Sequence, residues 1–181
     1  MQHKEILDFW FSDPKKWFNG GDEFDKMVQN TFWDIYQKAI EWELDDWLYQ
    51  PESCLALIIV LDQFSRNMFR GSPQAFEYDF KALYITKLAL KKWFLDWLEW
   101  PQKTFLVMPL MHSESLPDQD ECIKVFQELA KTDERYETNV QFAKEHRDII
   151  KQFWRFPHRN KILSRESTND EVGFLTTHSG F

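Results

Sequence analysis

The segment FAKEHRDIIKQFWRFPHRNKILSREST, residues 142–168, joins a strongly amphipathic pattern to a polar stretch that follows it. At about 100° per residue, a helix over residues 140–154 aligns Phe142, His146, Ile149 and Phe153 in one stripe. An apolar stripe of this kind stabilises a helix when it packs against other helices. The segment therefore predicts a packed helix with His146 in the middle of its buried face and Arg147 at the border of that face.

Two interpretations of His146 follow from this position. A buried polar group without a partner costs about 1–3 kcal/mol, so the ring nitrogens need hydrogen-bond partners. In the structural interpretation, His146 is a core residue bound by a carboxylate or a carbonyl group. In the functional interpretation, it is a general acid or base beside a pocket. Both remain open at this point.

The polar stretch after the helix carries a reversed charge. Pro157 disfavours a helical Phe156, so the helix is expected to end near Arg155. Residues 142–165 contain seven basic and two acidic side chains, whereas the whole chain has a net charge of −8. Positive charge near a helix C-terminus is favourable in itself. The alternative is an anion-binding site built from Arg155, His158, Arg159 and Asn160.

Length and composition predict one all-α domain over residues 1–181. Nine Trp and 17 Phe provide an aromatic core, and five Gly with seven Pro argue against a turn-rich β fold. The apolar periodicity gives about seven to nine helices with short connections.

Charge and apolar patterning exclude several classes of partner. Residues 1–60 hold five Lys, no Arg and twelve acidic residues, which argues against nucleic acid as a partner. The longest apolar run, residues 54–61, is well short of the ~20 residues that span a bilayer. The first residues lack a signal-peptide pattern, so we expect a cytoplasmic protein with no membrane partner. Cys54 and Cys122 lie in apolar patterns typical of reduced, buried thiols.

A helix over residues 51–69 is expected to be central, because its first half is apolar on every side. Its second half is polar, and Asp62 and Arg66 have the spacing of an ion pair on one helix face. Asp62, Arg66, Asn67 and Arg70 either line a ligand pocket or form buried ties and an end cap.

Further helices are predicted on both sides of this one. Asp22 is the expected N-cap of a helix that reaches about Ile40, and Ser72-Pro73 opens a helix that runs to Trp100. Trp93, Trp97 and Trp100 share one stripe of that helix, which packs in the core or, if exposed, binds a partner. The remaining predicted helices run from Pro101 to Pro109, from Leu116 through Leu129, and from Asn169 to Leu175 after a Thr168–Glu171 capping box.

His112 and Glu114 are candidates for acid–base chemistry or metal ligation, although one such pair is a weak pattern. The chain has no HExxH, CxxC, GxSxG, GxxxxGK[ST] or GxGxxG motif. We therefore predict no metal and no cofactor.

Several segments together resemble one family. They are ILDFWF (6–11), WF (17–18), LDQFSRNMFRG (61–71), HSE (112–114) and HRDIIKQFWRFPHRNKILSREST (146–168). They are similar to the bacterial proteins grouped as domain of unknown function 924. The resemblance implies stacked helical hairpins of the tetratricopeptide-repeat type and implies no established activity. The motif positions of this sequence are Asp62, Arg66, Asn67, Arg70, His112, Glu114, His146, Arg147, Asp148, Arg155, His158, Arg159 and Asn160.

The sequence departs from the family pattern at two positions. Ser65 stands where relatives have proline, and Trp154 stands where they more often have glycine. Because Trp154 is bulky, it is expected to narrow a neighbouring pocket.

Three functional hypotheses follow. The first is a binding module whose pocket or groove takes a small anionic ligand or a peptide; its ligand-binding candidates are Asp62, Arg66, Asn67, Arg70, Arg147, Arg155, Arg159 and Asn160. The second is a hydrolase-type enzyme with a histidine as general acid or base and a carboxylate that orients it; its candidates are His146, His158, His112, Glu114 and Asp62. The third is a protein whose polar motifs are buried ties between helices. Oligomeric state is left open.

Overall fold

A computed structural model describes residues 2–178 of the chain. The contacts divide the chain into two compact units, Met1–Pro109 (unit 1) and Leu110–Phe181 (unit 2). The boundary falls inside one helix, directly after its internal proline, Pro109. The expectation of a single domain over residues 1–181 stays a prediction, and each unit is described by itself below.

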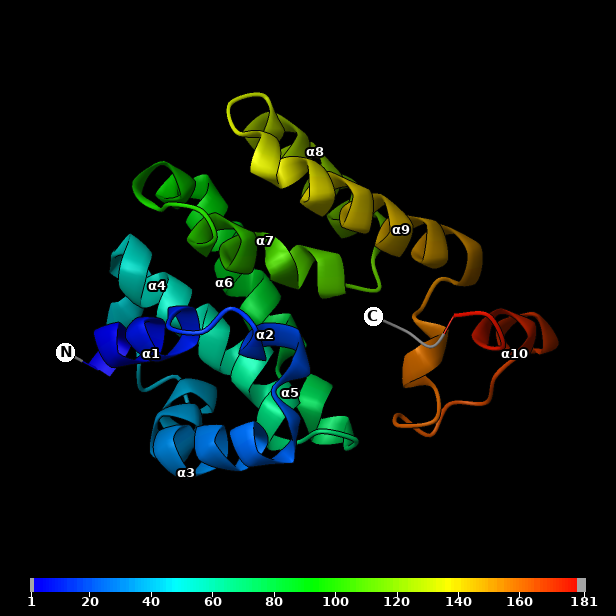
Figure 1. Cartoon of the computed structure of the whole chain (residues 1–181), viewed down its shortest axis with the longest axis horizontal. Coiled ribbons are helices and arrows are strands. Elements are labelled where there is room, and N and C mark those ends of the chain that lie inside the picture. The colour runs from blue at the N-terminus through cyan, green and yellow to red at the C-terminus, as the bar shows by residue number, and fades with distance from the viewer. Residues whose placement is uncertain (1, 179–181) are drawn as a thin grey trace. The chain divides into compact units, whose positions relative to one another are not determined.

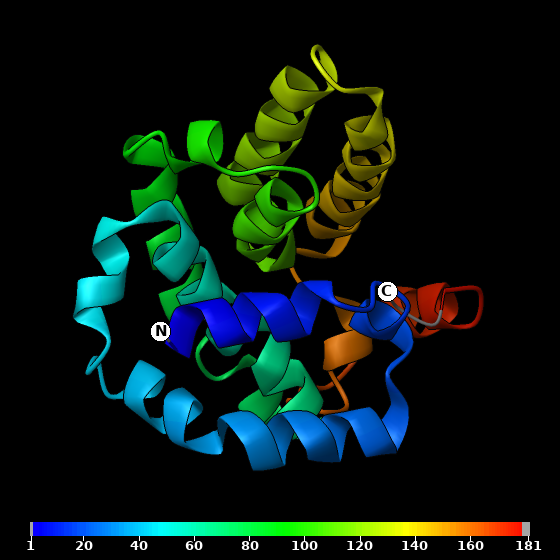
Figure 2. The same cartoon turned by 60° about the vertical axis from the view of Figure 1, so that its left-hand side comes forward.

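The described residues form helices and connecting turns without a β-strand, which confirms the predicted all-α fold (Figures 1 and 2). The α-helices are α1 (Gln2–Phe11), α2 (Lys16–Asn19), α3 (Gly21–Ile40), α4 (Pro51–Ile58), α5 (Ser65–Met68), α6 (Asp79–Lys91), α7 (Gln102–His112), α8 (Leu116–Ala130), α9 (Glu137–Phe153) and α10 (Asn169–Leu175). Short helical turns are η1 (Asp45–Tyr49), η2 (Ile59–Phe64), η3 (Pro73–Phe76), η4 (Phe94–Trp97), η5 (Glu134–Tyr136) and η6 (Pro157–Arg159).

The uninterrupted helical run α4–η2–α5 is the centre of unit 1. Helices α1, α3 and α6 all contact this run. Leu55, Ile58 and Ile59 are completely buried, as the apolar pattern predicts. Aromatic rings complete the core, because Trp10 of α1 packs edge-on against Phe64 and against Phe105 of α7. The central run therefore places Asp62, Arg66 and Asn67 on a well-packed helix.

The run is not a regular α-helix throughout. Segment η2, Ile59–Phe64, is a π-helical turn between α4 and α5. Turns of this kind are frequent at functional sites. The Ser65 hydroxyl donates to the carbonyl oxygen of Leu61 at 2.7 Å and approaches that of Ala75 at 3.3 Å. Ser65 therefore satisfies backbone acceptors at the end of the wide turn.

The single helix predicted from Ser72 to Trp100 is wrong. The structure has η3, α6 and η4 in its place, because Trp93 adopts a left-handed conformation with φ of 59° and ends α6. The helical stripe of Trp93, Trp97 and Trp100 does not form, and these side chains are 74%, 77% and 41% exposed. Of the two alternatives for these tryptophans, the core position is therefore wrong and the exposed position is the one observed.

Two other helix boundaries differ from expectation. Helix α3 begins at Gly21 with Gly20 at the N-cap, so Asp22 lies in the first turn instead of capping the helix. Helix α7 continues through Pro109 to His112. A helix-interior proline forfeits its own backbone hydrogen bond, and here the packed flanks Leu106, Val107 and Leu110, each 0% exposed, keep the helix continuous. The predicted Thr168–Glu171 capping box and helix 169–175 are confirmed.

Unit 2 is built on the hairpin of α8 and α9, which lie side by side (Figures 1 and 2). Its second part is a cluster of Ile149, Ile150 and Phe156 with Leu116, Phe153 and Phe174 packed against it. His146 is 7% exposed, as predicted, but Phe142 is 47% exposed and is not part of the buried face. The buried face is centred instead on Val140, Ala143 and Ile150.

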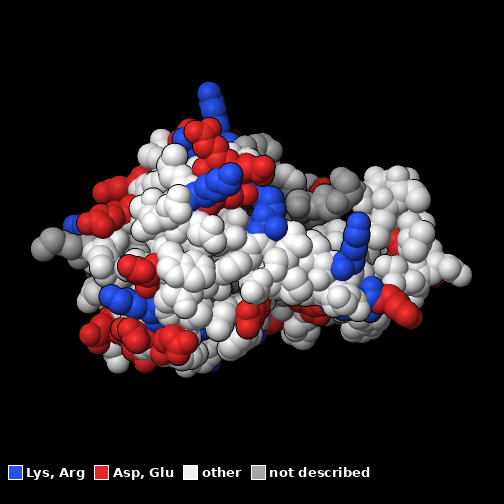
Figure 3. All heavy atoms as spheres, turned by 90° about the horizontal axis from the view of Figure 1, so that it is seen from below, with Lys and Arg blue, Asp and Glu red and all other residues white. Residues whose placement is uncertain are grey.

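Acidic side chains are prominent on the surface. On the face drawn in Figure 3, Asp and Glu atoms crowd the left-hand edge, in keeping with the net charge of −8. Within residues 2–178, the length and apolar character that a bilayer-spanning helix requires are not found together in any helix.

Candidate functional site

The polar motif positions are divided between the two units. Unit 1 contains Asp62, Arg66, Asn67 and Arg70, and unit 2 contains His112, Glu114, His146, Arg147, Asp148, Arg155, His158, Arg159 and Asn160. A pocket shared by both groups stays a prediction.

Arg66 is the centre of the unit 1 motif. Its guanidinium binds both carboxylate oxygens of Asp79 at 2.9 and 3.0 Å and lies 3.2 Å from the carboxylate of Asp62. Asp62 is 1% exposed and also accepts a hydrogen bond from the Gln63 amide at 2.6 Å. The predicted Asp62–Arg66 pair therefore exists, and Asp79 of α6 completes it.

Asn67 and Arg70 converge on one carboxylate of α3. Asn67 donates to Asp25 at 2.8 Å, and Arg70 binds both oxygens of the same carboxylate, one of them at 2.9 Å. These hydrogen bonds keep the pKa of Asp25 below its usual value even though burial acts in the opposite direction. The unit 1 motif thus connects α5 to α3 and α6 through paired charges.

Lys81 is a polar residue of unit 1 that the sequence did not single out. Its side chain is 1% exposed, and its ammonium group donates to the carbonyls of Ala39 and Ile40 at the end of α3. The same group lies 3.5 Å from the centre of the Trp42 ring, and burial lowers its pKa to about 8. Lys81 therefore caps α3, a role that depends on tertiary contact.

In unit 2, Glu114 is bound on both oxygens. Arg165 donates to them at 2.7 and 3.0 Å, and the backbone N–H of Phe156 donates at 2.8 Å. Although burial opposes the effect, these partners keep the pKa of Glu114 below its usual value. Arg165 also binds Asn160, which is 1% exposed. The Arg165–Glu114 ion pair therefore connects the loop after η6 to the turn that precedes α8.

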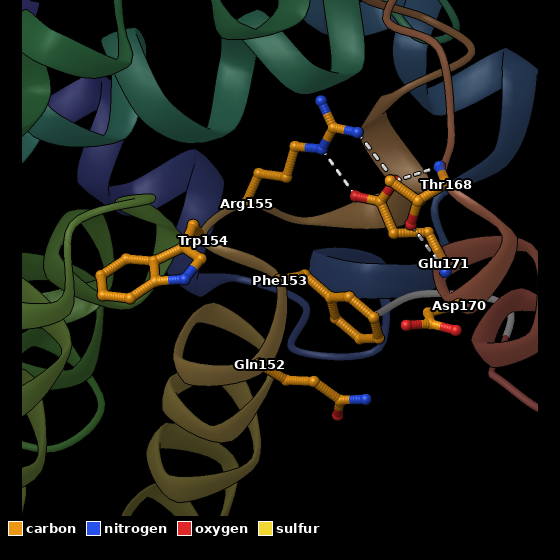
Figure 4. Close-up of a pocket in the computed structure, with 7 residues that line it drawn as sticks. All are labelled: Gln152, Phe153, Trp154, Arg155, Thr168, Asp170 and Glu171. Carbon is orange, nitrogen blue, oxygen red and sulfur yellow. Dashed lines mark hydrogen bonds and ion pairs between the residues drawn. The ribbon is translucent and has the colours of Figure 1, made fainter.

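Arg155 and Glu171 form a second ion pair. The guanidinium binds both carboxylate oxygens at 2.6 and 2.7 Å, and Glu171 accepts a further bond from the Thr168 backbone N–H at 2.7 Å (Figure 4). The hydrogen bond from Arg155 is the main reason that the pKa of Glu171 falls to about 2. Arg155 thus joins the end of α9 to the start of α10.

This ion pair forms one wall of a pocket of about 460 Å³. The pocket is lined by Gln152, Phe153, Trp154, Arg155, Thr168, Asp170 and Glu171. In Figure 4 the Phe153 ring and the Asp170 carboxylate lie on one side, and the indole of Trp154 points to the other. Trp154 borders the pocket, as the sequence suggested, but is 71% exposed.

Arg147 and Asp148 lie on the outer face of α9. Arg147 binds Asp120 of α8 at 2.8 Å, and Asp148 is largely exposed. This pair supports the α8–α9 hairpin at its surface.

Three side chains lie around the buried ring of Phe156: His146, His158 and Arg159. The ring centres of His146 and His158 lie 5.7 and 5.5 Å from that of Phe156. The guanidinium of Arg159, 7% exposed, lies 4.6 Å from the same ring centre. His112, at the end of α7, contributes to the lowered pKa of both His146 and His158. We call His112, His146, His158 and Arg159 the imidazole cluster.

The surroundings of His146 and His158 favour neutral imidazoles. Burial is the main cause that lowers the pKa of His146 to about 3, and the neighbouring His112, Arg159 and His158 lower it further. Burial, followed by Arg159, lowers the pKa of His158 to about 4. The Nδ1 atom of His146 lies 2.8 Å from the Phe142 carbonyl oxygen, which fits a neutral ring that donates from Nδ1.

Sequence reasoning missed the partners of these residues. Asp79, Asp25, Asp120 and Arg165 bind motif residues from 13 to 51 positions away, and no local spacing links them. Glu171 had a sequence signal in its capping box, which did not indicate Arg155 as a partner.

The potential metal ligands and the cysteine thiols among residues 2–178 were candidates for further chemistry. No group of three or more His, Cys, Asp or Glu side chains there could hold a metal ion. Cys54 and Cys122 are buried and free, and burial raises the pKa of Cys54 to about 12.

The fold and these motifs define a class of protein: an all-α protein whose buried polar motifs connect its helices, with an imidazole cluster in unit 2. The model of DUF924, described as a bacterial protein of unknown function, matches residues 6–179, and the chain belongs to this family. It is similar to the solved structure of a protein of unknown function from Agrobacterium tumefaciens, with 35% identity, 98% of each chain covered and a TM-score of 0.91. No curated protein matches the chain.

Proposed function

We propose that the protein is a binding module for a small anionic ligand and that the imidazole cluster of unit 2 is the binding site. The observation that carries this proposal is the packing of His146, His158 and Arg159 around Phe156. The imidazole N–H of His158 and the guanidinium of Arg159 are donors of the kind that recognise a carboxylate or a phosphate.

The electrostatics of the cluster differ from those of the other motifs. Arg66, Arg70 and Arg155 each bind a carboxylate, as expected for ties between helices. In the cluster, Arg159 lowers the pKa of His146 and of His158, whereas the Glu114 carboxylate raises the pKa of His158. A further anion bound beside these groups would raise both pKa values, and this supports a ligand site.

The same values favour binding over acid–base catalysis. An efficient general base has a pKa close to the working pH. The pKa values of about 3 for His146 and about 4 for His158 make both groups weak bases. Glu114, proposed to orient a histidine, is bound by Arg165 through both oxygens. The enzyme hypothesis therefore takes second place.

The proposal includes two finer expectations. The family resemblance implies a tetratricopeptide-like arrangement of hairpins, and the sequence pattern of the first residues implies a cytoplasmic location. The α8–α9 hairpin supports the first of them. In this proposal Asp62, Arg66, Asn67 and Arg70 act as ties within unit 1.

Titration calorimetry at pH 7 tests the proposal, with inorganic phosphate, phosphate monoesters, succinate and citrate as probes. We expect saturable binding of at least one probe. His158→Asn should bind that probe at least tenfold more weakly, which corresponds to a loss of about 1.4 kcal/mol of binding free energy. His178→Asn changes an exposed imidazole outside the cluster in the same unit and should bind like the wild type.

Two results would contradict the proposal. One is the absence of saturable binding by any of these anions. The other is equal binding by the wild type and His158→Asn while circular dichroism shows both to be folded.

A further inference from the structure

Two tryptophans between α6 and α7 are exposed to an unusual degree. Trp93 is 74% and Trp97 is 77% exposed. Tryptophan is largely buried in most folded proteins, and contiguous exposed apolar groups mark interaction surfaces. The neighbours Lys91 and Glu99 are exposed as well. We call Lys91, Trp93, Trp97 and Glu99 the tryptophan patch.

The backbone conformation of residues 93–98 keeps both indoles on the surface. Phe94 and Leu98 alternate with the tryptophans and are buried, at 8% and 3% exposed. The left-handed Trp93 is the residue that permits this alternation, and it accepts a hydrogen bond from the Asp96 N–H at 3.1 Å. A left-handed conformation in a residue other than glycine costs about 1–2 kcal/mol and persists only where packing enforces it. The patch is therefore a defined surface.

The tryptophan patch has a positive charge at one end of its sequence and a negative charge at the other. Along the chain the order is Lys91, Trp93, Leu95, Trp97 and Glu99, so opposite charges flank the two tryptophans at equal spacing from Leu95. A homodimer with its two-fold axis near Leu95 would pair Trp93 of one copy with Trp97 of the other. It would also pair Lys91 with Glu99 at both ends. A patch that is complementary to itself in this way suits an isologous dimer.

We propose that the tryptophan patch is the interface of a homodimer, with a second copy of this chain as its occupant. Four indoles supply up to about 600 Å² of the roughly 1,200–2,000 Å² that stable interfaces bury. The flanking Tyr49, 67% exposed, and Trp100, 41% exposed, are available to extend the contact. An anionic membrane is a poorer match, because Asp96 and Glu99 lie among the tryptophans and the chain carries −8.

Sedimentation velocity between about 1 μM and about 1 mM chain tests this, a range that covers moderate dimer affinities. We expect a monomer–dimer equilibrium in the wild type. The double variant Trp93→Ala/Trp97→Ala should raise the dimer dissociation constant at least about 30-fold, since central tryptophans dominate interface energy. Trp154→Ala removes an equally exposed tryptophan from unit 2 and should leave that constant unchanged.

Charge exchange tests the two-fold arrangement itself and leaves the indoles in place. Lys91→Glu and Glu99→Lys should each weaken the dimer, because each places like charges opposite one another at both ends. A mixture of the two variants should form a heterodimer, and the double exchange within one chain should restore the homodimer.

A wild-type chain that remains monomeric over the whole range overturns the proposal, as does a mixture of the exchange variants that stays monomeric. Co-sedimentation of that monomer with phosphatidylcholine–phosphatidylserine vesicles would assign the patch to a membrane surface instead.

Discussion

Phe156 is the residue around which the candidate site of unit 2 forms. Its ring is 0% exposed and contacts His146, His158 and Arg159, and its backbone N–H binds Glu114. Phe156 thus contacts two imidazoles and a guanidinium through its ring and a carboxylate through its backbone.

At the residue scale, we predict a specific effect of pH on stability. Between pH 6.5 and about 3 the unfolded chain binds a proton at His146 that the folded chain does not bind. Stability therefore falls as the pH falls through this window, by up to about 1.4 kcal/mol per pH unit. His158 contributes in the same direction between pH 6.5 and about 4. His146→Asn should make the slope shallower by up to about 1.4 kcal/mol per pH unit.

Urea unfolding at several pH values measures this slope. His178→Asn, which changes an exposed imidazole, serves as the control and should keep the wild-type slope. An unchanged slope in His146→Asn would mean that this imidazole titrates normally in the folded protein.

Glu171 gives a second prediction, in which stability again falls as the pH falls but over a lower pH range. Its pKa is about 2 in the folded protein and 4.5 ordinarily, so its contribution is complete above pH 4.5 and is lost as the pH falls toward 2. Glu171→Gln should lower stability at pH 7 and flatten the acid limb of the unfolding curve. Acid titration followed by circular dichroism measures this limb. Glu121→Gln, on the exposed side of α8, should behave like the wild type.

At the scale of elements, α5 and the turn directly after it carry two arginines, Arg66 and Arg70, with different burial. The side chain of Arg66 is 21% exposed and its partner Asp62 only 1%, whereas the side chain of Arg70 is 54% exposed. Loss of one partner from a buried pair costs about 3–5 kcal/mol, and an exposed pair contributes about 0–1 kcal/mol. Arg66→Met should therefore lower the free energy of unfolding by about 3 kcal/mol and Arg70→Met by less than about 1 kcal/mol.

Guanidinium-induced unfolding of the two variants provides the comparison. Equal losses in both would argue that the motif does not connect α5 to α6 through a desolvated pair.

The end of α9 offers a prediction about backbone conformation. Trp154 has φ of 61°, and its N–H donates to the Ile150 carbonyl at 2.8 Å. Glycine adopts this left-handed position without the steric cost that other residues have. Trp154→Gly should be more stable than Trp154→Ala by about 1 kcal/mol, measured by thermal unfolding. Trp33→Gly and Trp33→Ala, made in the middle of α3, should show the reverse order.

Elements differed in how well the sequence predicted them, for local reasons. The Thr168–Glu171 capping box acts within one helical turn, so helix 169–175 was predicted correctly. The end of α6 depends on a left-handed tryptophan, a conformation that the residue type disfavours. It therefore has no local signal, and the helix was predicted to be too long.

At the scale of the whole molecule, charge and exposed aromatic surface act together. The chain has an isoelectric point of about 5.1 and exposes Trp93 and Trp97. Since a net charge near zero promotes association, solubility should be lowest near pH 5. Trp93→Ser/Trp97→Ser should increase solubility there and leave the pH of the minimum unchanged, measured as protein left in the supernatant. An equal increase in solubility from Trp154→Ser would show that the tryptophan patch is not specifically responsible for association.

The same contrast between local and distant information applies to the candidate site. The all-α fold, the buried position of His146 and the Asp62–Arg66 pair follow from periodicity within single helices. Partners such as Asp79 for Arg66 and Arg165 for Glu114 come from separate elements. The sequence identified these polar positions, and only the tertiary structure supplies the counter-charges that bind them.

The wide turn of η2 has a consequence for chain length. A π-helical turn accommodates one more residue than the α-helical turn it replaces. Removing one residue from Ile59–Phe64 would let the turn become α-helical while the helix beyond it keeps its register. Arg66 would then still face Asp79. Inserting one residue there would instead rotate everything beyond it by roughly 100° about the helix axis. A single deletion within this turn should therefore be tolerated better than a single insertion.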